Sequence, residues 1–471
     1  MGLPTKTDMR RRLAPLAALV ALLAVSAVQA QTAADGVVGA WQAEESYYRA
    51  TILVERDAGG SLRAFFADAD LRPGAPLSAV AVRGDSVFFE AAEVGARFRG
   101  AFSSDGPAIR GTLTQGEVSV PLTLVPATAA APAPAAARPQ HPEPPYPYAV
   151  EDVAFEGGAP GVRLAATLTV PDGPGPHPAV VLVPGTGDND RDFEVYGHRP
   201  FLVLADRLTR RGVAVLRYDE RGVGGSGGDP HATSFDDEGR DVAAAVRYLQ
   251  GRAEVDAGRV GLVGHSSGGA NAPYVHERME RAAFLVLLMA PAAPMGELFR
   301  AQGPRMAAAH GASAAEVEAD RALGDAIVDA AAADTDSLTA AAAMAAAYDA
   351  AGWPEGLREA GVRANTSPAY RDLARYDPAP ALRRLDVPVL AVYGRADLAV
   401  TPDENAGSMA AALAASPSPD ATVLVLGGLN HYLQPSETGL EDEAAATTAT
   451  VDSRLLDVVS DWVATRAGVG T

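Results

Sequence analysis

A glycine-rich turn in the second half of the chain constrains the fold more than any other feature. Residues 260–263 form an apolar run typical of a buried strand, and Gly-x-Ser-x-Gly follows at 264–268, with Ser266 at its centre. A serine on a tight turn between a strand and a helix has strained backbone, so the residues two before and two after it must be small. The chain has 47 glycines, so a chance match is the alternative. The strand before the motif and the helix expected after it favour a nucleophile elbow.

A serine nucleophile needs a base, and composition narrows the choice. The chain has no cysteine, which excludes thiol nucleophiles, disulfides and cysteine-zinc sites. Its one lysine, Lys6, falls in the N-terminal leader, so a Ser-Lys dyad is unavailable to the mature chain. Among the eight histidines, His431 follows the last apolar strand, 421–426, where a doubly wound sheet presents its loops. His265, beside the serine, is expected to point away from it.

The base in turn needs an acid that fixes its tautomer and stabilises the imidazolium. Asp397 is the preferred candidate, because it follows the apolar strand at 387–393. Asp403 and Glu404 are nearby alternatives, but they are typical of acids at a helix N-terminus. The chain order Ser266, Asp397, His431 is the order expected for an α/β-hydrolase.

An oxyanion hole is the fourth expected part of this site. One donor is expected to be the backbone N–H of Ser267, the residue after the nucleophile. The other is expected from the Gly-rich loop at 184–188, which follows a strand at 179–183. Thr186 N–H is the preferred donor and Gly187 N–H the alternative. A plain glycine turn is the competing interpretation of this loop.

The first 30 residues have the pattern of a secretory signal peptide. A basic start precedes an apolar stretch at 13–25, and small residues precede Gln31. No later stretch reaches about 18 apolar residues, so the mature chain is expected to be secreted or periplasmic without a transmembrane segment. The net charge is −20 and becomes more negative once the leader is removed. Such a surface argues against nucleic acid and anionic membranes as partners.

The mature chain is expected to have two parts. Residues 36–125 contain short alternating stretches separated by Gly, Asp and Pro, which predicts an all-β accessory domain. A ligand-binding barrel is the alternative interpretation of this part. Residues 126–148 are rich in Pro and Ala and are typical of a stiff linker.

Residues 149–471 have the pattern of an α/β domain. Strand-like runs alternate with helical stretches, which predicts a mostly parallel sheet covered on both faces. The predicted strands are 149–156, 162–170, 179–183, 213–218, 259–263, 284–289, 388–393 and 421–426. Ala-rich helical sequence at 294–378 interrupts the alternation before the strand that carries the predicted acid. It is expected to form a cap over the carboxyl ends of the strands; helices packed on the outside are the alternative.

Several motifs carry a resemblance to a known family. They are the segments at 184–192, 197–201 and 217–224, the serine elbow, and Gly428-Leu429-Asn430-His431. With them the chain resembles bacterial exported α/β-hydrolases related to serine aminopeptidase-like and dienelactone hydrolase-like proteins that have an N-terminal β domain. The resemblance implies a Ser-Asp-His hydrolase. Relatives often have Glu after the nucleophile, where this chain has Ser267. Because the oxyanion donor is a main-chain N–H, the change should affect the pocket rather than the chemistry.

The expected reaction is two-step acyl transfer on a carboxylic ester through an acyl-enzyme. A serine aminopeptidase or amidase is the alternative, and it needs a group such as a carboxylate in the cap to hold a substrate amine. A non-catalytic envelope binding protein is the third hypothesis. The expected partner is a small-molecule ester or a short peptide, and no metal or organic cofactor is implied.

Two charged motifs beside the site need an interpretation. Asp219-Glu220-Arg221-Gly222 is expected to tie a loop together through an Asp–Arg pair rather than to take part in catalysis. Asp190-Arg191-Asp192 lies close to the predicted oxyanion loop, where it either orders that loop or contacts substrate.

Overall fold

The computed structural model describes most of the chain and divides it into two compact units. Residues 36–43, 51–57, 60–67, 73–91, 96–103, 106–115, 118–127, 138–353 and 355–469 are described. The first, the β unit, comprises residues 1–135 and 354–359, and the second, the α/β unit, comprises 136–353 and 360–471. The predicted signal peptide at 1–30 and residues 128–137 of the predicted linker lie outside the described residues.

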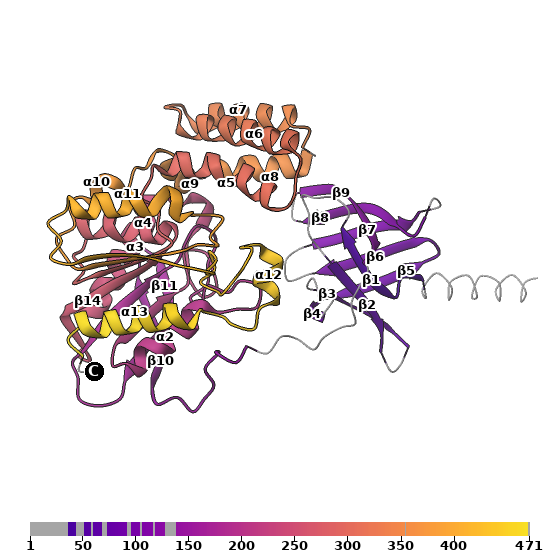
Figure 1. Ribbon diagram of the computed structural model, residues 1–471. Coiled ribbons are helices and arrows are strands. Elements are labelled where there is room, and N and C mark those ends of the chain that lie inside the picture. Colours follow the sequence, from indigo (N-terminus) through magenta and orange to yellow (C-terminus); the bar gives the residue numbers. More distant parts are fainter. Residues whose placement is uncertain are drawn as a thin grey trace, which may run out of the picture. The chain divides into compact units, whose positions relative to one another are not determined.

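The β unit contains an antiparallel sheet of nine strands (Figure 1). The strands are β1 (Gly39–Ala43), β2 (Thr51–Arg56), β3 (Leu62–Ala67), β4 (Pro73–Pro76), β5 (Ala79–Arg83), β6 (Ser86–Ala91), β7 (Ala96–Phe102), β8 (Ile109–Gln115) and β9 (Val118–Pro126). Their order in the sheet is β4-β3-β2-β1-β9-β8-β7-β6-β5. The first and last strands of the unit therefore pair at the middle of the sheet, and the all-β prediction is confirmed.

Alternation of side chains explains why these stretches form strands. In β7 the buried Phe98 lies between the exposed Arg97 and Arg99, as the period of two in a strand requires. The buried side chains form one apolar core that includes Phe89 and Leu124. The outward side chains of the same strands are left on the surface of the unit.

The α/β unit is built on a sheet of eight strands in the order β10-β11-β13-β12-β14-β15-β16-β17. The strands are β10 (Tyr148–Glu156), β11 (Arg163–Pro171), β12 (His177–Val183), β13 (Ala214–Tyr218), β14 (Val255–His265), β15 (Leu285–Leu288), β16 (Val389–Gly394) and β17 (Ala421–Leu426). Strand β11 pairs antiparallel with both of its neighbours, and from β13 to β17 all pairs are parallel. This arrangement confirms the predicted α/β-hydrolase fold with its mostly parallel sheet.

Helices cover both faces of this sheet (Figure 1). One layer contains α3 (Phe235–Gln250), α4 (Ser267–Arg278), α10 (Ala379–Leu382) and α11 (Pro402–Ala414), and the other contains α2 (Pro200–Arg210) and α13 (Ser453–Arg466). Each layer packs on its own apolar core; Val246 and Met409 belong to the first core, and Leu204 and Val459 to the second. Two short elements, η2 (Pro230–Ala232) and α12 (Glu441–Ala446), lie in connecting segments.

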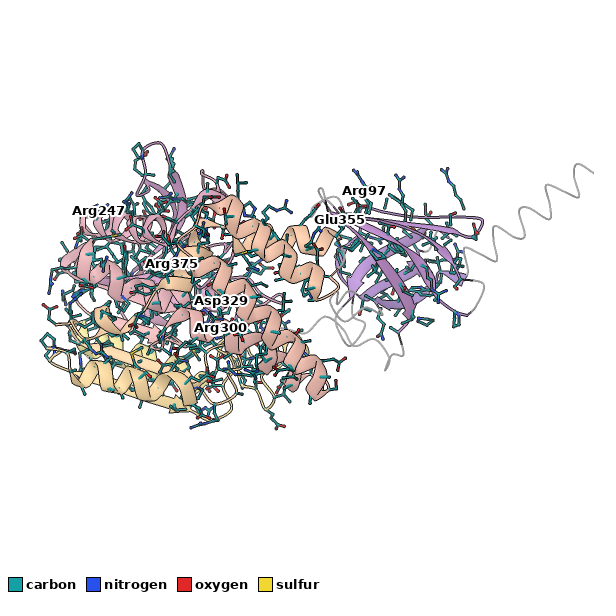
Figure 2. All side chains as sticks on the ribbon, turned by 90° about the horizontal axis from the view of Figure 1, so that it is seen from above. Arg97, Arg247, Arg300, Asp329, Glu355 and Arg375 are labelled. Atoms are coloured by element: carbon teal, nitrogen blue, oxygen red, sulfur yellow. The ribbon has the colours of Figure 1, made fainter. Side chains whose placement is uncertain are left out.

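The interval between β15 and β16 holds the predicted helical insertion. Its helices are α5 (Met295–Ala309), α6 (Ala314–Ala332), α7 (Ser337–Ala350), α8 (Glu355–Asn365) and α9 (Pro368–Arg375). A guanidinium ties the first two together, because Arg300 of α5 contacts Asp329 of α6 at 2.5 Å and Asp325 at 3.2 Å (Figure 2). No helix in the described part of the chain has the length and apolar character needed to cross a bilayer.

Candidate active site

Ser266 lies on a sharp turn between β14 and α4. Its backbone has φ 54° and ψ −124°, a conformation that L-residues rarely adopt. The Ser266 N–H donates to the carbonyl oxygen of Leu288, the last residue of β15, at 2.9 Å. The neighbouring strand therefore holds the strained turn in place, as a nucleophile elbow requires.

Close backbone packing explains the glycines of the elbow. A Cβ on Gly264 would lie 2.3 Å from the carbonyl oxygen of Gly268, and a Cβ on Gly268 would lie 2.2 Å from that of Pro184. A Cβ on Gly269 would meet the Cβ of Ala290 at 2.5 Å. All three separations are too short for real atoms, so the turn admits only glycine there without backbone shifts.

The structure brings Ser266, His431 and Asp397 together in one hydrogen-bonded row. His431 Nε2 lies 3.2 Å from Ser266 Oγ, and His431 Nδ1 lies 2.9 Å from Asp397 Oδ2. Only 2% of Asp397 is exposed, whereas Ser266 and His431 lie nearer the surface. An ionised carboxylate at Nδ1 requires a proton on that nitrogen, which leaves Nε2 free to accept the proton of the Ser266 hydroxyl.

Asp397 is fixed by the loop that follows β16. Its Oδ1 accepts the backbone N–H groups of Ala399 and Val400, both at 2.8 Å, so the carboxylate cannot turn away from His431. The two alternative acids lie elsewhere. Asp403 and Glu404 are in the first turn of α11, where Asp403 pairs with Arg395 at 2.6 Å and Glu404 pairs with Arg305.

The loop that carries His431 is held from two sides. The Asn430 side chain is fully buried, and its Oδ1 accepts the N–H groups of Tyr432 and Gln434 at 3.0 and 2.9 Å. From below, His265 Nε2–H donates to the carbonyl oxygen of His431 at 2.8 Å. Burial lowers the pKa of His265 to about 3, so this imidazole stays neutral.

His265 is a positioning residue that sequence reasoning missed. Its ring does turn away from the serine hydroxyl, as expected, but it packs on the His431 ring with a centroid distance of 4.8 Å. The two residues are 166 positions apart, so only the fold brings them together. The sequence shows only that a histidine lies next to the serine in the elbow motif, and this does not predict that His265 contacts His431.

The two predicted oxyanion donors lie opposite each other, Thr186 in the loop after β12 and Ser267 at the start of α4. Thr186 Oγ1–H donates to Ser267 Oγ at 2.9 Å, which joins the loop after β12 to the first residue of α4. Neither the Thr186 nor the Ser267 backbone N–H has an acceptor among the hydrogen bonds of the described residues. Both N–H groups are therefore available to a ligand, and the hydroxyl contact fixes their spacing.

Arg191 orders this oxyanion loop through Asp219. Asp219 accepts the backbone N–H of Arg191 at 2.9 Å and its guanidinium at 3.0 and 2.7 Å. The predicted Asp–Arg pair thus exists, but not within its own motif. Arg221 instead reaches Asp241 of α3 at 2.5 and 3.1 Å. The buried Asp219 accepts the N–H of Gly225 as well, so each of its two oxygens already has two donors.

A cavity of about 520 Å³ begins beside the two oxyanion donors. Thr186 and Ser267 line one end of it, and residues 360–373 of α8 and α9 line the other. Part of the insertion between β15 and β16 therefore covers the pocket instead of packing on the outside of the fold. The remaining walls come from the loop at 218–221, from η2 and from the first half of α3.

Four carboxyl groups line this cavity, those of Asp188, Glu220, Glu238 and Asp241. Burial raises the pKa of Glu238 to about 7, and the charge of nearby Asp241 adds to this effect. Burial also raises the pKa of Glu220 well above its usual range, with the charge of Glu238 as the next cause. Glu220 accepts the N–H and Nδ2–H of Asn189 at 2.9 and 3.0 Å, whereas the Glu238 carboxyl group has no hydrogen bond or ion pair among the described residues.

Sequence reasoning did not single out Glu238. Three acidic residues open α3, and they are typical of a helix N-terminus. Two of them have this role or bind arginine: Asp237 bonds Ser234 at 2.7 Å, and Asp236 pairs with Arg240 at 2.6 Å. Only the placement of α8 and α9 makes the third, Glu238, a residue of the pocket. Across the described residues no group of three or more acids and histidines could hold a metal ion.

Comparison with known proteins gives a family and several relatives. The family described as X-Pro dipeptidyl-peptidase (S15 family) matches residues 160–432. Esterase EstD of Thermotoga maritima is 27% identical over 307 residues, which cover 64% of this chain and 65% of EstD. The chain thus spans slightly less than two thirds of that relative's length.

Two solved structures are similar to part of this chain at low identity. The Pyrococcus furiosus esterase Pf2001 has a TM-score of 0.43 and 18% identity, covering 67% of this chain and 92% of its own. The α/β hydrolase GrgF of Penicillium sp. sh18 has a TM-score of 0.43 and 17% identity, covering 68% of this chain and 99% of its own.

Proposed function

Because the chain belongs to the X-Pro dipeptidyl-peptidase (S15) family, we propose that it is a serine hydrolase that cleaves carboxylic esters through an acyl-enzyme. One observation carries the proposal: His431 joins Ser266 Oγ at 3.2 Å to the buried Asp397 at 2.9 Å. A histidine that only occupies a surface loop is not expected to contact a buried carboxylate through one ring nitrogen and a serine on a strained turn through the other. The esterase EstD, at 27% identity, supports an ester as the substrate.

The first half of the reaction forms the acyl-enzyme. His431 Nε2 takes the proton of Ser266 as Oγ attacks the ester carbonyl carbon, and the carbonyl oxygen becomes an oxyanion. The backbone N–H groups of Ser267 and Thr186 donate to that oxyanion, which stabilises it in a site from which water is displaced. When the tetrahedral intermediate collapses, the bond to the leaving alcohol breaks. The protonated His431 gives its proton to the departing oxygen.

The second half repeats these steps with water as the nucleophile. His431 takes a proton from water, whose oxygen attacks the acyl carbon on Ser266. Collapse of the second intermediate breaks the bond to Ser266 Oγ, which recovers its proton from His431. The carboxylic acid leaves, and the protein returns to its starting state.

Hydrolysis of amides or short peptides with a free amine is the second candidate, and the acidic cavity favours it. Glu238 faces the space next to the oxyanion donors with no partner of its own among the described residues, so it could hold a substrate ammonium group. Two arginines also line the cavity: Arg221, which pairs with Asp241 of the same wall, and Arg363 of α8. Because Arg221 and Asp241 offset each other, the carboxyl groups of Asp188, Glu220 and Glu238 outnumber Arg363, and ionisation of Glu238 above its pKa of about 7 favours a cation there.

Parallel assays of the mature chain distinguish the two candidates. We expect turnover of short acyl p-nitrophenyl esters, and a fluorophosphonate probe should label one peptide that contains Ser266. Aminoacyl p-nitroanilides test the second candidate, and their N-acetylated forms are matched controls without the charge. Absence of ester and amide turnover, or labelling that persists in Ser266→Ala, would refute the proposed nucleophile.

The sequence pattern of residues 1–30 supports export of the mature chain to the periplasm or the medium. We also propose that the protein comes from a bacterium, that its substrate is a small molecule or a short peptide, and that nucleic acid is not among its partners. Cell fractionation with an antibody to the α/β unit tests the export. A full-length chain that keeps its leader in the cytoplasm would contradict export.

A further inference from the structure

The outer surface of the β unit has a hollow bordered by arginines. Ala81, Ser86 and Ala101 give it a floor of small side chains, and Arg83, Arg99 and Arg110 border it; its volume is about 660 Å³. Strand register explains this arrangement. Arg83 pairs with Ser86, Ser86 with Ala101 and Ala101 with Arg110, so one row across four strands has an arginine at each end.

Aromatic and hydroxyl groups hold two of these arginines in place. The Arg99 guanidinium lies over the Phe88 ring at 5.7 Å from its centroid, and Arg110 Nη1 donates to Ser103 Oγ at 2.9 Å. Arg97 lies on the same outer face, where it pairs with Glu90 at 2.7 Å (Figure 2). The contacts of Arg99 and Arg110 restrict these side chains in the free protein, so a ligand would remove less side-chain entropy on binding.

The charge of the hollow is opposite to that of the chain. The whole chain has a net charge of −20, yet three guanidinium groups surround this one surface of small residues. Arg83 and Arg99 have no carboxylate partner among the described residues. Guanidinium groups bind carboxylate, sulfate and phosphate oxygens through paired N–H donors, and several of them around one floor favour a ligand with more than one acid group.

We propose that this arginine hollow binds an acidic polysaccharide, a sugar chain that carries carboxylate or sulfate groups. Ser86 and Thr112 add hydroxyl groups to this face, and Phe88 adds a half-buried ring, which together suit a polar sugar chain. A lipid surface fits less well. Within the described residues, the exposed large apolar side chains are Val38, Val150, Tyr196, Leu338 and Val425, and none belongs to β5–β8.

Polysaccharide binding here is independent of the proposed hydrolase chemistry. The elbow, the histidine loop, the acid loop and the cavity all belong to the α/β unit, whereas the hollow belongs wholly to the β unit. Such a surface would keep the protein near a charged glycan. The polysaccharide proposal and the hydrolase proposal can therefore be refuted independently. A protein that hydrolyses esters but does not bind acidic polysaccharide would contradict only the proposal for the hollow.

The test measures binding of the full mature chain to polygalacturonate and to dextran sulfate, with uncharged dextran as a control. We expect binding to the two acidic polymers that weakens as salt rises, because guanidinium–acid contacts release counterions. The variant Arg83→Gln/Arg99→Gln should bind about tenfold more weakly. Arg83→Lys/Arg99→Lys keeps the charge and should recover part of the affinity.

A matched control removes the same charge elsewhere. Arg163 and Arg383 are exposed residues of the α/β unit without an ion pair among the described residues, and Arg163→Gln/Arg383→Gln should bind as the unchanged protein does. Ester turnover and circular dichroism report that each variant is folded. Three results would overturn the proposal: no binding of either acidic polymer, equal weakening in both Gln variants, or binding to anionic lipid vesicles in place of the polymers.

Discussion

Substitution of the buried acid gives the sharpest test of the site. In Asp397→Asn the amide oxygen can still accept the N–H groups of Ala399 and Val400, so the loop should keep its shape. The amide NH₂ would then face His431 Nδ1, where the carboxylate lies at 2.9 Å. An NH₂ group is a donor, so it favours the histidine tautomer that has no proton on Nδ1 and carries one on Nε2.

The wrong tautomer determines the size of the effect. A protonated Nε2 at 3.2 Å from Ser266 Oγ cannot take the proton of the hydroxyl, although the two residues stay in place. Loss of tautomer control in a triad costs about 10⁴-fold in turnover. That factor corresponds to roughly 5.4 kcal/mol of transition-state stabilisation, at about 1.36 kcal/mol for each factor of ten.

Steady-state hydrolysis of a short p-nitrophenyl ester measures this loss. We expect kcat to fall by about 10⁴-fold with KM nearly unchanged, because the cavity is not touched. Asp403→Asn is the matched control: Asp403 is an exposed residue that pairs with Arg395 in the first turn of α11, and its change should stay within a few-fold. A larger loss in Asp403→Asn than in Asp397→Asn would refute the assignment of the acid.

Three further predictions follow from the contacts of the α/β unit. His265→Ala should lower kcat about tenfold to a hundredfold at constant KM, because the His431 carbonyl loses its donor; His265→Gln, which offers an amide N–H, should recover part of it in the same assay. Gly268→Ala should abolish activity or soluble expression, since its Cβ would lie 2.2 Å from the Pro184 carbonyl oxygen. Gly407→Ala is the control: the position in α11 has open space around it, so Tm should be unchanged or higher. Glu238 has a pKa of about 7 in the folded chain, above the usual value of 4.5, so folded protein keeps a proton that unfolded protein has released and stability falls as pH rises from about 4.5 through 7. Urea unfolding at pH 5 and pH 8.5 should show a smaller difference in Glu238→Gln than in the unchanged protein, and an equal difference would contradict this origin.

Local signals made the fold and the candidate site readable in sequence. The elbow needs glycines at fixed offsets from Ser266, and the strands before Asp397 and His431 are continuous apolar runs. A parallel sheet places the carboxyl ends of such strands at one edge, so three residues far apart in the chain could be expected to meet. The structure places them within hydrogen-bond distance of one another in that order.

The ion-pair partners of Asp219 and Arg221 could not be predicted from the sequence, because they depend on how close the loops lie in the fold. Asp219 is two residues from Arg221 in the chain but bonds Arg191, which reaches it from the oxyanion loop. The Arg221 guanidinium, which was expected to pair with Asp219, donates to the carboxylate of Asp241 in α3. Each charge found a partner of the expected sign, so the prediction of an ion pair was right and the prediction of its location within the motif was wrong.

The proposed ammonium contact of Glu238 would connect stability with substrate choice. A carboxylate next to an apolar wall and without a partner is costly to ionise, which is why its pKa is raised to about 7. A residue used only to cap α3 would gain nothing from this position, since Asp237 already bonds the N-cap Ser234. The cost is offset when a cationic group enters the cavity and pairs with the carboxylate. If the cationic group is the amine of the acyl part, as in the proposed amino acid substrates, the leaving group is free to vary, and esters and amides of the same amino-bearing acid would share this contact. Selection for the acyl group by Glu238 is therefore compatible with either leaving group, and the choice between ester and amide rests on how well His431 delivers its proton to oxygen or nitrogen.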